Sequence, residues 1–259
     1  MTDPWKVVKN KDIDYSGVKM DTDHDLHSNL APPLDVIRNG SLILIVGSSG
    51  SGKTSLLVNL VSKKTKCRQS TKKQSLHKCF HKVVMCSPSL KTLKQDVFKI
   101  PKSQKFTCFH KCMHEIEGLI EPLPTCGDDE GDDETLFNLL ILDDVATSLK
   151  ECRDNELLLT RLLQNRRHKN LTTIVLVQKW NHLPTGIRNN ANVVFIFRPK
   201  TMQEQESICK EILPIHPREC IDLFNWVFDK AFVHLMIDMT LLRSNTFRYF
   251  KNFELIEGL

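Results

Sequence analysis

A glycine-rich loop is the clearest chemical feature of the sequence. Residues 47–54 read Gly-Ser-Ser-Gly-Ser-Gly-Lys-Thr and match the pattern G-x-x-x-x-G-K-[ST] in full. Glycines let the backbone turn so that its N–H groups face a phosphate, and the dipole of a following helix adds positive potential. Lys53 can reach the β- and γ-phosphates of ATP, and the Thr54 hydroxyl can bind Mg²⁺. The predicted ATP-binding residues are Gly47, Ser48, Ser49, Gly50, Ser51, Gly52, Lys53, Thr54 and Ser55.

Two consecutive carboxylates end a later apolar run. Residues 139–142 are Leu-Leu-Ile-Leu, and Asp143 and Asp144 follow directly. A buried strand of this kind presents the acids at its carboxyl end, beside the phosphate-binding loop. We expect Asp143 to hold Mg²⁺ through its water shell, and Asp144 to orient or deprotonate the attacking water.

A polar side chain, Gln178, follows the β-branched run at 172–177. At the end of a strand it is well placed to sense the γ-phosphate. A second acid and a polar sensor are typical of a hydrolase. A small-molecule kinase instead positions an acceptor hydroxyl. In such a kinase the second acid and the polar sensor would have no assigned role. The pattern therefore favours ATP hydrolysis.

The elements that must position these groups alternate along the chain. Short apolar runs predict strands at 41–46, 83–86, 105–109, 139–142, 172–177, 193–197, 233–239 and 245–250. Helical spacing predicts helices at 54–62, 90–98, 154–168, 201–213 and 217–228. Strands alternating with helices indicate an α/β fold with a mostly parallel central sheet covered by helices on both faces. We expect residues 1–39 to form a polar N-terminal arm and residues 40–259 to form one domain.

Composition narrows the class of protein. The chain has 259 residues, of which 41% are hydrophobic and 26% charged, both ordinary values for a globular domain. It contains no apolar run long enough to span a membrane and no signal-peptide core at its N-terminus, which predicts an intracellular protein. The nine cysteines are then expected to be reduced thiols. The net charge of +5 permits contact with a polyanion without demanding it.

Four motifs together resemble the poxvirus-type genome-packaging ATPases of the FtsK–HerA superfamily, which occur in large DNA viruses and virus-like transposons. The motifs are GSSGSGKT at 47–54, LLILDDV at 139–145, RRHKNLTTIVLVQ at 166–178 and LPTGIRNNANVVFIFR at 183–198. They appear in the family's order and at similar spacing, and the resemblance covers residues 40 to 200. One position departs from the wider superfamily, in which many members carry Glu where this chain has Asp144.

The resemblance implies a RecA-like (ASCE) P-loop core whose subunits form a ring and drive double-stranded DNA into a preformed capsid. It assigns Lys53 and Thr54 to phosphate and Mg²⁺, Asp143 to Mg²⁺, Asp144 to water activation and Gln178 to sensing. The implied partners are double-stranded DNA, further copies of the chain, and capsid or portal-region proteins. The implied location is a viral factory in the host cytoplasm or nucleus, with association with the virion left open.

A ring ATPase also needs an arginine from a neighbouring subunit to stabilise charge on the γ-phosphate in the transition state. The candidates are Arg167, which precedes His168 in the family's Arg-His pair, and Arg188, which lies in the loop after the Gln178 strand; Arg166 is a third. Each could equally be a surface or phosphate-contacting arginine, and the sequence does not choose among them.

Two other functions stay open. One is a different FtsK–HerA-type motor, which pumps DNA in segregation or conjugation. The other is a nucleotide-dependent assembly protein that binds ATP with little turnover.

Several features outside the motifs also allow two interpretations. Cys108, His110, Cys112 and His114 could supply zinc ligands, but their spacing is not that of a standard zinc finger, and they could equally be core thiols and solvated histidines. The acidic run 128–134 and the basic stretch 63–82 are typical of solvated segments, although the basic stretch could contact DNA phosphates.

Overall fold

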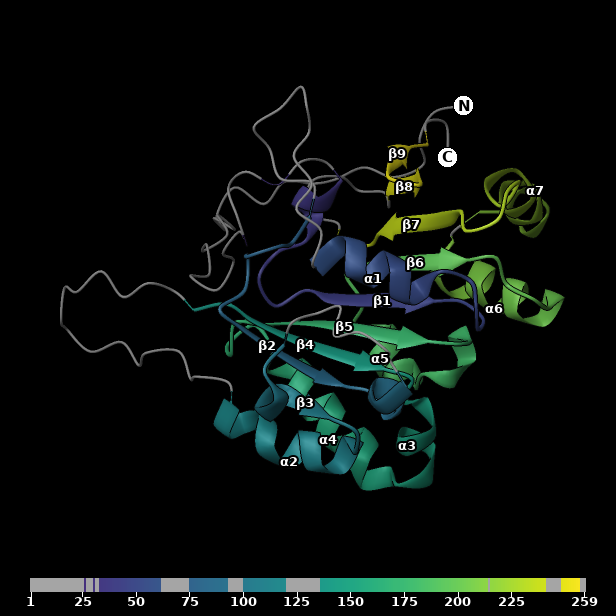
Figure 1. The fold of residues 1–259 in the computed structure, drawn as a ribbon. Coiled ribbons are helices and arrows are strands. Elements are labelled where there is room, and N and C mark those ends of the chain that lie inside the picture. The colour runs from purple at the N-terminus through teal and green to yellow at the C-terminus, as the bar shows by residue number, and fades with distance from the viewer. Residues whose placement is uncertain are drawn as a thin grey trace, which may run out of the picture.

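A single nine-stranded sheet runs through the described part of the molecule (Figure 1). The computed structural model describes residues 26, 30, 33–61, 75–92, 100–119, 136–213, 215–240 and 248–256. The strands, in chain order, are β1 (Leu42–Val46), β2 (Lys82–Cys86), β3 (Lys105–Phe106), β4 (Asn138–Asp143), β5 (Leu171–Val177), β6 (Val193–Phe197), β7 (His234–Asp238), β8 (Arg248–Lys251) and β9 (Glu254–Leu255).

Helices connect these strands. The α-helices are α1 (Lys53–Val61), α2 (Phe109–Leu119), α3 (Ala146–Glu151), α4 (Arg153–Gln164), α5 (Thr185–Arg188), α6 (Met202–Ile212) and α7 (Pro217–Val227). Single 3₁₀ turns occur at η1 (Leu34–Val36), η2 (Pro88–Thr92), η3 (Lys102–Gln104) and η4 (Trp180–His182). Among the described helices, none is long and apolar enough to cross a membrane.

The sheet is parallel over most of its width. Its strand order is β3-β2-β4-β5-β1-β6-β7-β8-β9, and every pair from β3 to β6 is parallel. The last three strands are antiparallel to their neighbours. The predicted α/β fold with a mostly parallel sheet is confirmed.

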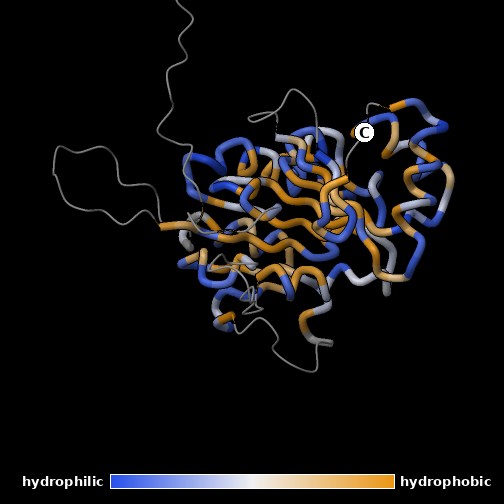
Figure 2. Tube along the Cα trace, turned by 90° about the horizontal axis from the view of Figure 1, so that it is seen from above, coloured by the Kyte–Doolittle hydropathy of each residue, from blue (hydrophilic) through white to orange (hydrophobic). Residues whose placement is uncertain are grey.

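Alternate residues of the strands face two separate cores. Leu42, Leu44 and Val46 of β1 pack in the core that includes α2, α3, α4, α6 and α7, whereas Ile43 and Ile45 pack in the core that includes α1. Because both faces are covered, every residue of β1 is buried and the strand is a continuous apolar run. In Figure 2 the central strands are hydrophobic, whereas the segments around them mix hydrophilic and hydrophobic residues.

The predicted strand at 105–109 is wrong in its second half. Only Lys105 and Phe106 pair with β2, and α2 begins at Phe109. The helix has the stronger packing arrangement, because Phe109, Cys112 and Ile116 recur at helical spacing and are all buried. The predicted helix at 154–168 is also shorter, since α4 ends at Gln164 and a turn precedes β5.

Several expectations fall on residues outside the described part of the chain. These are the acidic run 128–134, most of the basic stretch 63–82, most of the predicted helix 90–98 and the first 25 residues of the predicted arm. The division of the chain at residue 40 stays a prediction. The described residues just before that position belong to the packed unit, because Leu34, Val36 and Ile37 are buried in the same core as α1.

The amino ends of the central strands are held together by Arg166. Its guanidinium donates to the carbonyl oxygen of Gly40 at 2.7 Å, to that of Leu163 at 2.6 Å and to that of Asn190 at 3.1 Å. Burial and the neighbouring charge of Arg167 lower the pKa of Arg166 to about 10, so the group stays charged at neutral pH. The side chain thus ties the start of β1 to the end of α4 and to the turn before β6.

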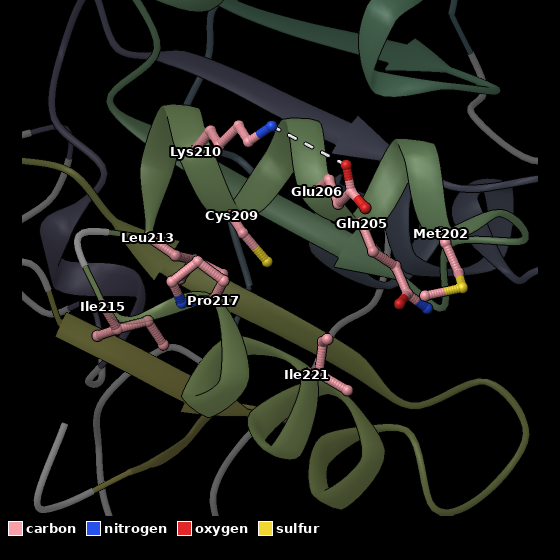
Figure 3. Close-up of a pocket in the computed structure, with 9 residues that line it drawn as sticks. All are labelled: Met202, Gln205, Glu206, Cys209, Lys210, Leu213, Ile215, Pro217 and Ile221. Carbon is pink, nitrogen blue, oxygen red and sulfur yellow. Dashed lines mark ion pairs between the residues drawn. The ribbon is translucent and has the colours of Figure 1, made fainter.

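A disulfide joins α6 and α7 through Cys209 and Cys220, which corrects the expectation that all nine cysteines are reduced thiols. Cys209 lies on the wall of a cavity of about 520 Å³ between the two helices (Figure 3). Met202 of α6 and Ile221 of α7 also line this cavity, and none of its lining residues comes from the 47–54 loop.

His234 is buried among aromatic rings. Its ring centroid lies 5.6 Å from those of Phe195 and Phe197 and 4.9 Å from that of Phe253. Among the described residues, its Nε2 atom has no hydrogen-bond partner. Burial lowers the pKa of His234 to about 4, so the folded protein keeps this imidazole neutral at pH values where an unfolded chain protonates it.

We expect His234 to make the protein less stable as the pH falls. Below the unfolded pKa of about 6.5 the unfolded chain gains a proton that the folded chain binds only near pH 4, which removes about 2 kcal/mol between pH 7 and pH 5. His234→Leu should lack this contribution. Urea denaturation of both proteins at the two pH values measures it, and equal losses of stability would contradict the assignment.

Candidate active site

The carboxyl ends of four parallel strands meet at one edge of the sheet. Cys86 of β2 is level with Leu142 of β4, and Asp143 is level with Leu176 of β5. Val46 of β1 is in turn level with Val177. The residues that follow these strand ends therefore lie side by side: Ser87, Asp144, Gln178 and Gly47.

The loop between β1 and α1 depends on glycine at two positions. A Cβ atom on Gly47 would lie 2.7 Å from Cβ of Phe197, a distance that only a glycine avoids. Gly52 has a φ of +109°, a conformation that side-chain-bearing residues rarely adopt. Glycine at these two positions therefore permits the tight turn at 47–52 that precedes the N-terminus of α1.

Lys53 points into the loop that precedes it. Its ammonium donates to the carbonyl oxygen of Gly47 at 2.6 Å and to that of Ser48 at 3.0 Å. Burial lowers the pKa of Lys53, while the charges of Asp143 and Asp144 oppose that shift. The loop, the lysine and the two carboxylates are thus close enough to act on one another.

Asp143 is held by a residue that the sequence analysis did not identify. The hydroxyl of Ser87 donates to Oδ2 of Asp143 at 2.9 Å, and Ser87 is completely buried. Burial raises the pKa of Asp143 and the charge of Asp144 adds to the rise, whereas the bond from Ser87 and the charge of Lys53 lower it. A signal was available, because Ser87 is the first polar residue after the apolar strand β2.

Asp144 and Gln178 face each other across the ends of β4 and β5. The Gln178 side-chain amide donates to both carboxylate oxygens of Asp144, at 3.2 and 3.1 Å. Asp144 has a φ of +55°, a left-handed conformation that costs a non-glycine residue on the order of 1–3 kcal/mol. Both side chains are exposed, so the pair is accessible to a ligand at this edge.

The arrangement fits a phosphate and a divalent cation. Ser51 Oγ is buried and, among the described residues, has no hydrogen-bond partner, which leaves a polar atom free inside the phosphate-binding loop. A cation beside Asp143 would compensate the burial of its carboxylate and lower its pKa. Thr54 and Ser55 are exposed at the first turn of α1, where their hydroxyls are accessible.

Arg188 lies in an internal network. Its guanidinium contacts the Glu211 carboxylate at 2.6 Å and donates to Asn181 Oδ1 at 3.2 Å and to Thr185 Oγ1 at 3.0 Å. It also lies over the ring of Trp180, 5.3 Å from the ring centroid. Trp180 is fully buried and donates its indole N–H to Glu211 at 2.9 Å, so these groups fasten α5 and η4 to α6.

Arg167 differs in exposure from the other two candidate arginines. Its side chain is exposed, whereas those of Arg166 and Arg188 are buried. It precedes β5 and therefore lies at the amino edge of the sheet. The seven residues of β5 place that edge on the order of 20 Å from Gln178.

The Cys108–His114 cluster is divided by a helix. Cys112 is fully buried, whereas Cys108, His110 and His114 are exposed, because residues two apart point to different sides of α2. A hydrogen bond with Cys86 and burial raise the pKa of the Cys112 thiol, which disfavours the thiolate that zinc requires. Within the described ranges, no group of three or more His, Cys, Asp or Glu side chains is arranged to hold a metal.

Replacing Ser87 with alanine should shift the acid limit of Mg·ATP binding to higher pH. The change removes the hydrogen bond that lowers the pKa of Asp143, so the carboxyl becomes protonated at a higher pH than in the wild type. Titration of nucleotide affinity against pH measures the shift. Ser207→Ala is the matched control, because the hydroxyl of Ser207 donates to the carbonyl oxygen of Gln203 within α6. Identical acid limits for wild type and Ser87→Ala would contradict this role.

Comparison with solved structures shows the same fold in viral ATPases. B204, the DNA-packaging ATPase from Sulfolobus Turreted Icosahedral Virus, matches with a TM-score of 0.53 at 14% identity, over 82% of this chain and 98% of that chain. The genome packaging NTPase B204 from Sulfolobus turreted icosahedral virus 2, in complex with sulfate, matches with a TM-score of 0.52 at 16% identity, over 86% of this chain and 100% of that chain. At these identities the likeness is one of fold.

Sequence comparison is more specific. No curated protein sequence matches the chain. The family model described as Poxvirus A32 protein matches residues 36–212, which is more than half of the chain and includes the phosphate-binding loop, both acids and Gln178. The resemblance inferred from the four motifs is therefore confirmed, and the chain belongs to the poxvirus A32 protein family.

Proposed function

We propose that this protein is an ATP-hydrolysing DNA translocase that packages a double-stranded viral genome into a capsid. The observation that carries the proposal is the meeting of the 47–54 loop, Asp143, Asp144 and Gln178 at one edge of the sheet, in a chain of the poxvirus A32 family. The fold that it shares with the DNA-packaging ATPase B204 supports the same conclusion.

The residues divide the work of phosphoryl transfer. The N–H groups of residues 47–55 hold the phosphates, and Lys53 exchanges its contacts with the loop carbonyls for contacts with the β- and γ-phosphates. Mg²⁺, when bound, neutralises charge on the phosphate oxygens. Thr54 and Asp143 would hold it, with Ser87 fixing the carboxylate of Asp143.

Asp144 is proposed to activate water. Its carboxylate is exposed at the site and is oriented by Gln178, which donates to both of its oxygens. When the γ-phosphate is bound, Gln178 can release Asp144 and contact the phosphate. The Asp144 carboxylate is then available to accept a proton from water only when substrate is present. This exchange would give Gln178 its sensing role.

Coupling of hydrolysis to DNA requires several subunits. We propose a homo-oligomeric ring that surrounds double-stranded DNA and docks on capsid or portal-region proteins. It would act inside the host cell, in a viral factory of the cytoplasm or nucleus, and stay associated with the virion. Among the three arginines considered, Arg167 is proposed as the group that reaches the neighbouring subunit's site, because its side chain is exposed. Arg188 is proposed to be structural.

Two other functions make different predictions. A different FtsK–HerA-type motor would share the ATPase chemistry and hydrolyse ATP with DNA, but would not associate with capsid proteins. A nucleotide-dependent assembly protein would bind ATP and turn it over slowly, whether or not DNA is present. The exposed Asp144–Gln178 pair favours turnover, because a binding module has no need for a positioned base.

DNA should stimulate ATP hydrolysis by the assembled protein. Lys53→Ala should abolish both basal and stimulated hydrolysis, because the variant loses the contact to the phosphates. Asp144→Asn should bind ATP with near wild-type affinity and lose turnover by on the order of 100-fold or more, since it keeps its shape but cannot take up a proton. Steady-state rates with and without double-stranded DNA, alongside mass measurement of the oligomer, test this. A slow, DNA-indifferent rate in a confirmed oligomer would favour the assembly protein.

Arg167→Ala should impair ATP hydrolysis, whereas Arg188→Ala should impair stability. Arg167→Ala should keep its melting temperature and ATP affinity while losing hydrolysis in the oligomer, because only the neighbouring site is affected. Arg188→Ala removes the ion pair to Glu211 and the cation–π contact with Trp180, and should lower the free energy of unfolding by about 2–4 kcal/mol. Mixed oligomers of Arg167→Ala with Lys53→Ala subunits provide a further check. Restored hydrolysis in the mixture would support a role for Arg167 across the subunit boundary, and no restoration in a mixture that assembles would contradict it.

A further inference from the structure

A second cavity lies directly beside the phosphate-binding loop. It has a volume of about 580 Å³, within the range of small-molecule sites. Its walls come from three separate segments: Ser48, Gly50 and Ser51 of the loop, residues 197–200 after β6, and residues 229–233 before β7. The two later segments meet there because β7 is antiparallel to β6 and Phe197 is paired with His234.

Phe232 projects an aromatic ring at the mouth of this cavity. It is 70% exposed, more than any other large hydrophobic residue in the described part of the chain. Its φ is +64°, a conformation that costs a bulky residue on the order of 1–3 kcal/mol. A Cβ atom placed on Gly52 would lie 3.4 Å from its ring, so the ring borders the phosphate-binding loop itself. Core packing does not explain an exposed aromatic ring held in a strained turn.

The positive charge around the cavity favours a ligand that carries phosphates. Arg198, Lys200 and Lys230 line it and are exposed, and within the described residues none of them forms an ion pair. The one carboxylate on its wall, Asp229, is paired with Lys251 at 3.1 Å. A nucleotide whose phosphates lie on the neighbouring 47–54 loop would therefore meet both this positive charge and the ring of Phe232.

We propose that this cavity takes the nucleobase and ribose of the bound nucleoside triphosphate, with the base stacked on Phe232. The inference rests on the proposed function, because it assumes that the 47–54 loop holds a triphosphate. Stacking on an aromatic ring tolerates different bases and strengthens with the area of the base. The protein should therefore prefer purine to pyrimidine triphosphates.

The same features could instead contact nucleic acid, but the geometry favours the nucleotide. Three residues of the phosphate-binding loop line the cavity, so a ligand there is continuous with a triphosphate on that loop. Double-stranded DNA keeps its bases stacked inside the duplex, and an aromatic side chain contacts their faces only after the duplex is unstacked or kinked. A duplex would use Arg198, Lys200 and Lys230 and leave Phe232 without a partner.

Calorimetric titration of Phe232→Ala with Mg·ATP and with Mg·tripolyphosphate tests the inference. Tripolyphosphate carries the phosphates without the base. We expect Phe232→Ala to weaken ATP binding roughly 5- to 100-fold, to leave tripolyphosphate binding unchanged and to abolish the preference for ATP over UTP. Phe232→Trp should keep the wild-type affinity for ATP. Trp226→Ala is the matched control, because Trp226 is an exposed aromatic residue that does not line the cavity.

Each other outcome overturns the inference in a distinguishable way. If wild type and Phe232→Ala bind both ligands equally, the base does not stack on Phe232, and the proposed function stands. If Phe232→Ala weakens both ligands to the same extent, the ring supports the loop and not the base. If it weakens only the binding of double-stranded DNA, the cavity contacts nucleic acid. If the wild type binds neither ligand, the proposed function fails together with the inference.

Discussion

The shared register of β2, β4, β5 and β1 brings the site together. In parallel strands the carboxyl ends lie at the same edge of the sheet. Strand pairing alone therefore places the polar residues that follow adjacent strands close to one another. Ser87, Asp143, Asp144 and Gln178 reach the phosphate-binding loop in this way. A one-residue slip of β4 against β5 would exchange the side chains that face the two cores and separate the acids from Gln178. The two buried cores therefore also protect the geometry of the site.

Burial sets the charge balance at this edge. It disfavours the charged forms of both Lys53 and Asp143, lowering the pKa of the lysine and raising that of the acid, while their mutual attraction opposes both shifts. Such a site gains from a ligand that carries its own charges, because a phosphate compensates the lysine and a metal compensates the carboxylate. The exposed pair of Asp144 and Gln178 lies at the rim of this region, where water has access. The groups proposed for binding and for catalysis thus differ in their degree of burial.

Two arginines in the family motifs stabilise the fold. Arg166 bonds to three backbone carbonyls at the amino edge of the sheet, and Arg188 joins Trp180 and Glu211 near the opposite edge. A planar guanidinium with five donors suits both positions, because it can satisfy several acceptors that converge from different segments. Motif residues of this kind preserve the shape of a site without touching its ligand. Arg167, next to one of them, is exposed.

The sequence by itself determined the fold class, the glycine-rich 47–54 loop and the strand that carries the two acids, because these depend on local patterns. An apolar run ending in Asp143 and Asp144, and a loop that requires glycine, are visible without knowing their neighbours. The tertiary structure alone decided what depends on contacts between distant segments. It showed that Ser87 holds Asp143, that Arg188 is paired with Glu211, that Cys209 bonds to Cys220 and that residue 109 starts a helix. Phe232 became a candidate for the same reason, since only the antiparallel pairing of β6 and β7 brings its turn beside the 47–54 loop.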